Sequence, residues 1–155
     1  PGTFDPITNG HLDIIERASE IFDRVIVSVY AMSSKSVLFS AEERLDLCRQ
    51  SVKKFSNIEV VSFTGLAVSF ARDIGATAMI RGLRAGSDFE NEFDMAMMNR
   101  QLAPNMETVF LMSRLQWQFL SSSRIKEVVQ LGADVTNMVP SHVRNILQTK
   151  LGLST

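Results

Sequence analysis

Two kinds of hydrophobic pattern alternate along this chain. Short runs rich in β-branched residues predict buried strands, and these runs cover residues 24–31, 58–63, 77–80 and 108–112. Segments with apolar residues three or four positions apart predict amphipathic helices between and after these strands. The helices are expected over residues 12–22, 41–55, 65–74, 87–102, 123–131 and, from Pro140 or Ser141, to Lys150. Alternating strands and helices predict an α/β fold in which helices cover both faces of a parallel sheet.

Local signals mark helix starts and a candidate site. Ser40–Glu43 and Ser87–Glu90 have the Ser-x-x-Glu pattern of a capping box at a helix start. Polar segments follow three of the predicted strands, at Ser33–Lys35, Arg81–Arg84 and Ser121–Ser123. Because parallel α/β sheets bind ligands beyond the carboxyl ends of their strands, these segments are expected to meet at one site.

The most distinctive segment is residues 1–11, with the sequence PGTFDPITNGH. Two prolines and two glycines predict a turn that ends in Thr8-Asn9-Gly10-His11, where the first helix begins. Glycine lets a ligand approach the backbone, the helix start offers unpaired N–H groups, and the His11 imidazole adds a donor. This combination predicts a phosphate site. Such a turn should follow a strand, so we also expect a central strand before Pro1, without which the fold would not be stable.

Composition predicts a single globular domain over residues 1–155. Hydrophobic residues make up 45% and charged residues 21%, which is typical of soluble proteins. The net charge of −1 gives no support to a nucleic-acid surface. Without a run long enough to span a bilayer or a signal peptide, no membrane association and a cytoplasmic location are expected. One cysteine and two histidines allow neither an internal disulfide nor a zinc site of the usual kind.

Cysteine and methionine are expected to serve packing. Cys48 lies in a predicted amphipathic helix, so it is interpreted as a core residue. Met95, Met97, Met98 and Met106 cluster late in the chain and are interpreted as core or subunit packing. The stretch from Met95 to Met106 has more apolar residues than one helix face of a small domain needs, which favours a homo-oligomer.

The candidate chemistry is that of a phosphorus centre. Arg81 and Arg84 flank Gly82 in a predicted loop, and a planar guanidinium suits phosphate oxygens. Ser121–Ser123 can cap a helix and can also cradle a polyphosphate, while Lys35 adds a further cation. The sequence has neither the P-loop pattern nor Gly-x-Gly-x-x-Gly, and no clear nucleophile. A cationic, donor-rich cleft of this kind favours electrostatic stabilisation of phosphoryl chemistry.

Four segments carry a family resemblance: PGTFDPITNGH (1–11), IRGLRAGSDFENE (80–92), MNRQLAP (98–104) and WQFLSSSRIKEV (117–128). Together they closely resemble the bacterial phosphopantetheine adenylyltransferases, which are nucleotidylyltransferases with a T/H-x-G-H signature. The similarity covers essentially the whole chain, and the arginine and serine segments make it specific. It implies a Rossmann-like nucleotidylyltransferase fold with a five-stranded parallel sheet, a short strand before Pro1 and a homohexamer.

The resemblance also implies a reaction. The phosphate of 4′-phosphopantetheine would attack the α-phosphorus of ATP directly, with Mg²⁺ present, and give dephospho-coenzyme A and pyrophosphate. Dephospho-coenzyme A or coenzyme A would bind as product or inhibitor. No metal-ligating residues are expected.

Residue roles follow from the same resemblance. The catalytic residues would be Thr3, His11, Lys35 and Arg84. The ATP-binding residues would be Thr3, Phe4, His11, Gly82, Leu83, Arg84, Glu92, Trp117, Gln118, Phe119, Leu120, Ser121, Ser122 and Ser123. The residues that bind the phosphopantetheine substrate would be Thr3, Lys35, Ala67, Arg81 and Asn99.

Some positions depart from the family pattern, and two alternatives stay open. Ser36 and Val37 stand where Lys-Pro is common, Met32-Ser33 replaces Asn-Pro or Ser-Pro, and Asn91 replaces a frequent aromatic residue. One alternative is a related nucleotidylyltransferase acting on a glycerol phosphate or a nicotinate nucleotide, which should have a different arginine loop. The other is a nucleotide-binding regulatory module without catalysis, which has no need of four groups aimed at the α-phosphate.

Overall fold

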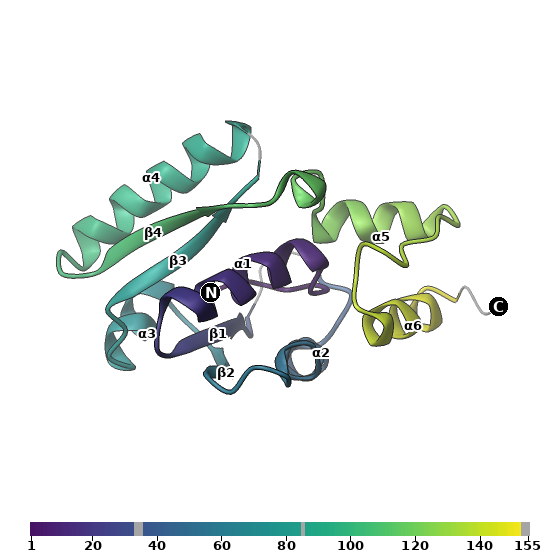
Figure 1. The fold of residues 1–155 in the computed structure, drawn as a ribbon, viewed down its shortest axis with the longest axis horizontal. Helices are drawn as coiled ribbons and strands as arrows, with labels where there is room; N and C mark the ends of the chain where they lie inside the picture. The colour runs from purple at the N-terminus through teal and green to yellow at the C-terminus, as the bar shows by residue number, and fades with distance from the viewer. Residues whose placement is uncertain (33–35, 85, 153–155) are drawn as a thin grey trace.

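The computed structural model describes residues 1–32, 36–84 and 86–152 (Figure 1). Helices and strands alternate along most of the chain, which confirms the predicted α/β fold with parallel strands. The elements are α1 (Asn9–Ile21), β1 (Val25–Tyr30), α2 (Ala41–Val52), β2 (Ile58–Phe63), α3 (Ala67–Asp73), β3 (Ala78–Leu83), α4 (Gly86–Leu102), β4 (Glu107–Met112), the 3₁₀ turn η1 (Leu115–Trp117), α5 (Ser122–Gln130) and α6 (Ser141–Lys150).

The strands form two parallel pairs. β1 pairs with β2, from Val25 opposite Ile58 onward, and β3 pairs with β4, from Ala78 opposite Glu107 onward. Across residues 1–32, 36–84 and 86–152 these pairs are two separate two-stranded sheets, so the expected single five-stranded sheet is not formed by the described residues. Helix α1 packs against both β1 and β3 and joins the pairs (Figure 1).

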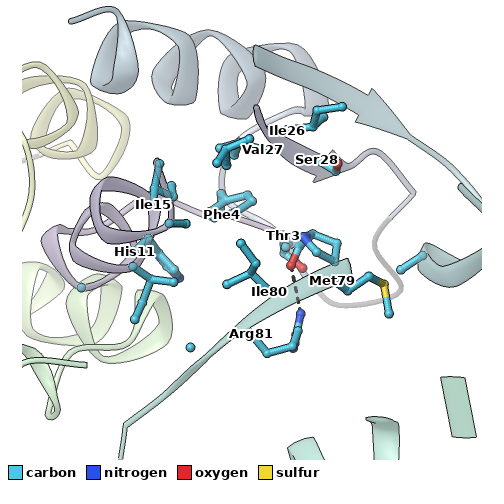
Figure 2. Close-up of a pocket in the computed structure, with 18 of the residues that line it drawn as sticks. Thr3, Phe4, His11, Ile15, Ile26, Val27, Ser28, Met79, Ile80 and Arg81 are labelled. Atoms are coloured by element: carbon cyan, nitrogen blue, oxygen red, sulfur yellow. Dashed lines mark hydrogen bonds between the residues drawn. The ribbon is translucent and has the colours of Figure 1, made fainter. Parts of the chain in front are cut away.

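Residues of β1, β3 and α1 line one cavity. Figure 2 shows Val27 of β1 and Ile80 of β3 beside it, with Ile15 of α1 also lining it. Gly2 forms a parallel bridge with Val29 of β1: its N–H donates to Ser28 O at 2.9 Å and its carbonyl accepts from the Tyr30 N–H at 2.9 Å. The chain at Gly2 therefore runs along β1 at one end of the cavity, and the expected strand before Pro1 stays a prediction.

Strand β3 extends further than the sequence pattern predicts. The prediction that Arg81, Gly82 and Leu83 lie in a loop is wrong, because these residues pair in register with Phe110, Leu111 and Met112 of β4. Continued parallel pairing with a distant segment is a tertiary effect that the pattern of residues 77–80 cannot reveal.

Helix boundaries agree to within a few residues, with one capping error. Ser40 caps α2 in the predicted capping box with Glu43. The capping box predicted at Ser87–Glu90 is wrong, because α4 begins at Gly86 and Ser87 lies inside it. Thr8 caps α1, and His11 itself is the reciprocal partner in that capping box, which places His11 in the first helical turn.

The core confirms the packing predicted for Cys48 and shows which of the late methionines are buried. Cys48 is fully buried in the main cluster with Leu47 and Phe39, and burial raises the pKa of its thiol to about 12. Met106 is also buried. Met95, Met97 and Met98 of α4 are each more than half exposed in this single chain. Of the two interpretations given for them, core packing is therefore wrong and subunit packing stays a prediction. Within the described ranges, the helices are all too short or too polar to cross a membrane.

Candidate active site

The loop of residues 2–6 is held in an unusual conformation beside His11. Phe4 has a φ of 50°, in the left-handed region that non-glycine residues rarely adopt. Its buried ring meets the His11 ring edge-on, with ring centroids 5.1 Å apart. A Cβ on Gly2 would lie 2.9 Å from that ring, so glycine is required there. Packing of Phe4 thus fixes both the loop and one side of the imidazole.

The hydrogen bonds of His11 define its tautomer. The Thr8 N–H donates to Nδ1 at 3.0 Å. Since a backbone N–H can only donate, Nδ1 must be the acceptor, which leaves the proton of the neutral ring on Nε2. Burial, together with the smaller effects of the nearby Arg84 and Arg81 charges, lowers the pKa of His11 to about 4. At neutral pH the site therefore presents a neutral imidazole whose Nε2–H is free of the Thr8 contact.

Arg84 connects the end of β3 to the serine segment. Its Nη1 donates to Leu120 O at 2.7 Å. Ser121 caps α5 by accepting from the Arg124 N–H, and the Ser122 hydroxyl donates to Pro6 O at 2.8 Å. Capping accounts for only one of the three serines. The start of α5 is therefore fastened to the loop that precedes α1, and two helix N-termini converge on one cavity.

Arg81 and Glu92 were predicted to serve different ligands, but they contact each other. Arg81 donates to the Glu92 carboxylate through Nε at 2.7 Å and Nη2 at 2.6 Å. Its Nη1 donates to Pro1 O at 2.9 Å, and Figure 2 draws a dashed line from Arg81 for this bond. This bidentate pair fixes the guanidinium plane at the mouth of the cavity.

Most predicted site residues line one cavity. Those that line it are Thr3, Phe4, His11, Ala67, Arg81, Gly82, Arg84, Glu92, Leu120, Ser121, Ser122 and Ser123. Leu83, Trp117, Gln118, Phe119 and Asn99 do not line it. Lys35 lies outside the described residues.

Two charged residues at the cavity were missed by the sequence analysis. Asp5 is buried and accepts from the N–H groups of Leu38 and Phe39. Lys126 of α5 pairs with the same carboxylate. Lys126 lies four residues after Ser122 on one helix face, so its spacing was a usable signal. No local signal shows that Asp5 binds a segment more than thirty residues away.

The comparisons with known proteins agree with this geometry. The family model described as cytidylyltransferase-like matches residues 1–128. The phosphopantetheine adenylyltransferase of Desulforudis audaxviator is 53% identical over 153 residues, covering 99% of this chain and 94% of its own. That of Alkaliphilus metalliredigens is 53% identical over 150 residues, covering 97% and 96%.

The chain belongs to the phosphopantetheine adenylyltransferase family. A solved structure from Vibrio parahaemolyticus, assigned as a nicotinate-nucleotide adenylyltransferase, superposes with a TM-score of 0.72 at 19% identity. The match covers 99% of this chain and 93% of that one. At this identity the match establishes the shared fold. In this family member, the cavity combines a neutral imidazole donor, two guanidinium groups and two helix N-termini, all suited to phosphate oxygens.

Proposed function

We propose that this chain transfers the adenylyl group of ATP to 4′-phosphopantetheine and releases dephospho-coenzyme A and pyrophosphate. The observation that carries the proposal is 53% identity over 99% of the chain to a relative named for this activity. An oxygen of the pantetheine phosphate forms a bond to the α-phosphorus of ATP as the bond to the β-phosphate oxygen breaks. No covalent enzyme intermediate is required, and the buried Cys48 thiol is not available as a nucleophile.

Charge stabilisation is the chemistry that the site residues supply. The Nε2–H of His11 would donate to an α-phosphate oxygen as negative charge develops there. Arg84 and the N–H groups at the start of α5 would hold the ATP phosphates, while Thr3 would orient the attacking phosphate. These groups line one cavity in the structure, which supports their assignment to one reaction.

Mg²⁺ is proposed to enter with ATP. The described residues contain no group of three or more His, Cys, Asp or Glu side chains able to hold a metal ion. The cavity fits a magnesium ion carried mainly by substrate phosphates, which is the usual mode for this cation. When bound, the ion neutralises charge on the departing pyrophosphate.

The phosphopantetheine acceptor would extend from Arg81 toward Ala67, the first residue of α3. Ala67 and Arg81 line the same cavity as Thr3, which supports their assignment to phosphopantetheine. Asn99, outside this cavity, keeps its family-based role as a proposal. We further propose a cytoplasmic enzyme that binds dephospho-coenzyme A or coenzyme A as product or inhibitor.

A homohexamer is proposed from the surface of α4. Large apolar side chains on this helix are about half exposed in the single chain: Phe89, Phe93, Met95, Met97, Met98 and Leu102. Patches of this size on a small soluble domain are typical of subunit interfaces. The number six rests on the family resemblance.

Product analysis tests the reaction. Purified protein with ATP and Mg²⁺ should release pyrophosphate with 4′-phosphopantetheine and form dephospho-coenzyme A. Glycerol 3-phosphate and nicotinate mononucleotide should support little release. A preference for either one would identify a different nucleotidylyltransferase. ATP binding without release in the presence of any acceptor would identify a regulatory module.

A further inference from the structure

Arg44 of α2 is a buried cation with an unusual set of partners. Its side chain is only 1% exposed, although arginine is rarely buried without a carboxylate partner. Across the described residues, no carboxylate forms an ion pair with it. Instead, its guanidinium donates to backbone carbonyl groups from three separate segments.

One of these carbonyls belongs to Thr3, which lines the candidate active site. Nη1 donates to Thr3 O at 2.8 Å and to Tyr30 O at 2.7 Å. Nη2 donates to Ala31 O at 3.4 Å and Nε to Phe39 O at 3.1 Å. One side chain thus fixes the loop that carries Thr3, the end of β1 and the end of the segment before α2. The rigid fork of a guanidinium allows this, whereas the compact ammonium of lysine does not.

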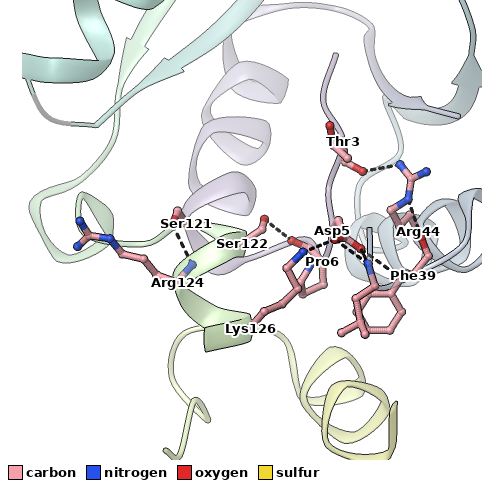
Figure 3. A network of polar contacts seen from close by, with 10 residues as sticks. Thr3, Asp5, Pro6, Phe39, Arg44, Ser121, Ser122, Arg124 and Lys126 are labelled. Atoms are coloured by element: carbon pink, nitrogen blue, oxygen red, sulfur yellow. Dashed lines mark hydrogen bonds and ion pairs between the residues drawn. The ribbon is translucent and has the colours of Figure 1, made fainter. Parts of the chain in front are cut away.

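Phe39 is held from a second side. Its N–H donates to Asp5 Oδ1 at 2.9 Å, while its carbonyl accepts from Arg44. Asp5 is paired with Lys126 of α5, so α5, the loop before α1 and α2 form one polar network (Figure 3). The network extends from Ser122 to Thr3, and both residues line the same cavity as Ser36 and Val37.

The charges in this network do not cancel. Lys126 and Asp5 neutralise each other, whereas the Arg44 guanidinium has only carbonyl dipoles around it. The buried Arg44 cation is hydrogen-bonded to the Thr3 carbonyl, so it adds a positive potential at Thr3 that favours an anionic group there. The arrangement suits a phosphate held at Thr3.

We propose that Arg44 is a positioning residue for the phosphate of the acceptor substrate, acting through Thr3 and the backbone at Ala31 and Phe39. This inference rests on the proposed function. It assigns Arg44 no contact with either substrate, and it assigns the ATP side of the cavity to other residues.

Kinetics of the Arg44→Lys variant, with each substrate varied in turn, test this inference. Lysine keeps the charge but cannot serve all four carbonyls, so the KM for phosphopantetheine should rise about tenfold or more. The Kd for ATP, measured by calorimetry, should stay within about twofold of the wild-type value. Asp5→Asn weakens the hydrogen bonding that holds the Phe39 backbone, so it should also raise the KM for phosphopantetheine. Arg49→Lys, at an exposed position on the same helix, should change neither.

The outcomes are distinguishable. If Arg44→Lys weakens ATP binding by the same factor as it raises the KM for phosphopantetheine, Arg44 is only a stabilising residue and the inference is wrong. The inference is also wrong if the variant changes neither value. If that variant fails to fold, Asp5→Asn decides by the same KM comparison. If the wild type releases no pyrophosphate, the proposed function fails. Calorimetric titration of phosphopantetheine into wild type and variants then still tests whether Arg44 governs phosphate binding.

Discussion

At the scale of single residues, His11 combines a structural and a chemical role. Its Nδ1 completes the capping box of α1, and this contact directs Nε2 away from the helix end. The first helical turn therefore fixes both the position and the tautomer of the proposed donor. The charge-bearing residues around it are likewise held by neighbours: Arg81 by Glu92 and Arg84 by Leu120 O.

Replacing His11 with alanine should remove most turnover. Loss of one preorganised donor to a transition-state oxygen costs on the order of a hundredfold or more in kcat. Steady-state pyrophosphate release measures this, with ATP affinity and folding expected to be largely retained. Glu43→Ala removes the equivalent capping residue of α2, far from His11 in sequence, and should keep turnover. Near-normal kcat in folded His11→Ala would remove His11 from its proposed role.

The lowered pKa of His11 should also make stability depend on pH. An unfolded histidine titrates near 6.5, whereas His11 titrates at about 4 in the fold. The full stability is present above pH 6.5, where the imidazole is neutral in both states. As pH falls from 6.5 toward 4, only the unfolded state binds the proton, so the free energy of unfolding falls by up to about 3 kcal/mol. His11→Gln keeps a capping-box residue, so its stability should fall less over this range. Urea denaturation at pH 7 and pH 5 gives the comparison, and equal losses in both proteins would contradict it.

Arg84 and Arg81 should give different defects. Arg84→Ala should weaken ATP binding and lower turnover, since its guanidinium is proposed to hold the ATP phosphates. Arg81→Ala should chiefly raise the KM for phosphopantetheine. Arg124→Ala, at an exposed position in α5, is the matched control and should affect neither. The division of roles is wrong if both variants show the same defect toward ATP alone.

At the scale of elements, the site depends on how closely α1 approaches β3. At Gly82 the strand passes against Ile14 of α1, and a Cβ there would lie 2.9 Å from Ile14 Cγ1. The glycine that sequence analysis assigned to ATP binding is thus also required for packing. This contact holds His11 on α1 near Arg81 on β3 and Arg84, the residue that follows β3.

Gly82→Ala should lower the free energy of unfolding by about 1–3 kcal/mol through overpacking. If the clash with Ile14 is the cause, the double variant Gly82→Ala/Ile14→Ala should be more stable than the sum of the single effects predicts. A coupling of about 1 kcal/mol or more in urea denaturation supports this explanation. Additive effects would show that Ile14 is not responsible.

At the scale of the whole molecule, α4 exposes several large apolar side chains. Phe89 and Phe93 stack with ring centroids 5.9 Å apart, and Met97 follows one turn later. In the main body, by contrast, α1, α2, α5 and α6 enclose a continuous core. The exposed stripe of Phe89, Phe93 and Met97 supports the proposed homo-oligomer.

Light scattering at micromolar concentration should give a mass several times 17.3 kDa, close to six chains. The double variant Phe93→Glu/Met97→Glu should yield smaller species, because it places charge in the proposed interface. Leu131→Glu changes an isolated exposed leucine and should leave the mass unchanged. A wild-type mass near 17.3 kDa would contradict the oligomer.

The sequence by itself determined the order of strands and helices and the start of α2. It also led to the proposal that the segments around His11, Arg84 and Ser121 bind phosphate. These properties depend on local periodicity, on caps a few residues apart, and on side-chain chemistry. The pattern also identified Cys48 as core, because its neighbours in the helix are apolar.

Only the tertiary structure decided which distant groups meet. Pairing with β4 keeps Arg81 on a strand, and the ion pair with Glu92 joins two residues expected at different ligands. Arg44 donates to carbonyls of remote segments, which the sequence of α2 cannot predict. The exposure of the apolar side chains on α4 likewise depends on which elements pack beside this helix. Periodicity reports that a residue has an apolar or polar environment, but the partner is fixed only when remote segments fold together.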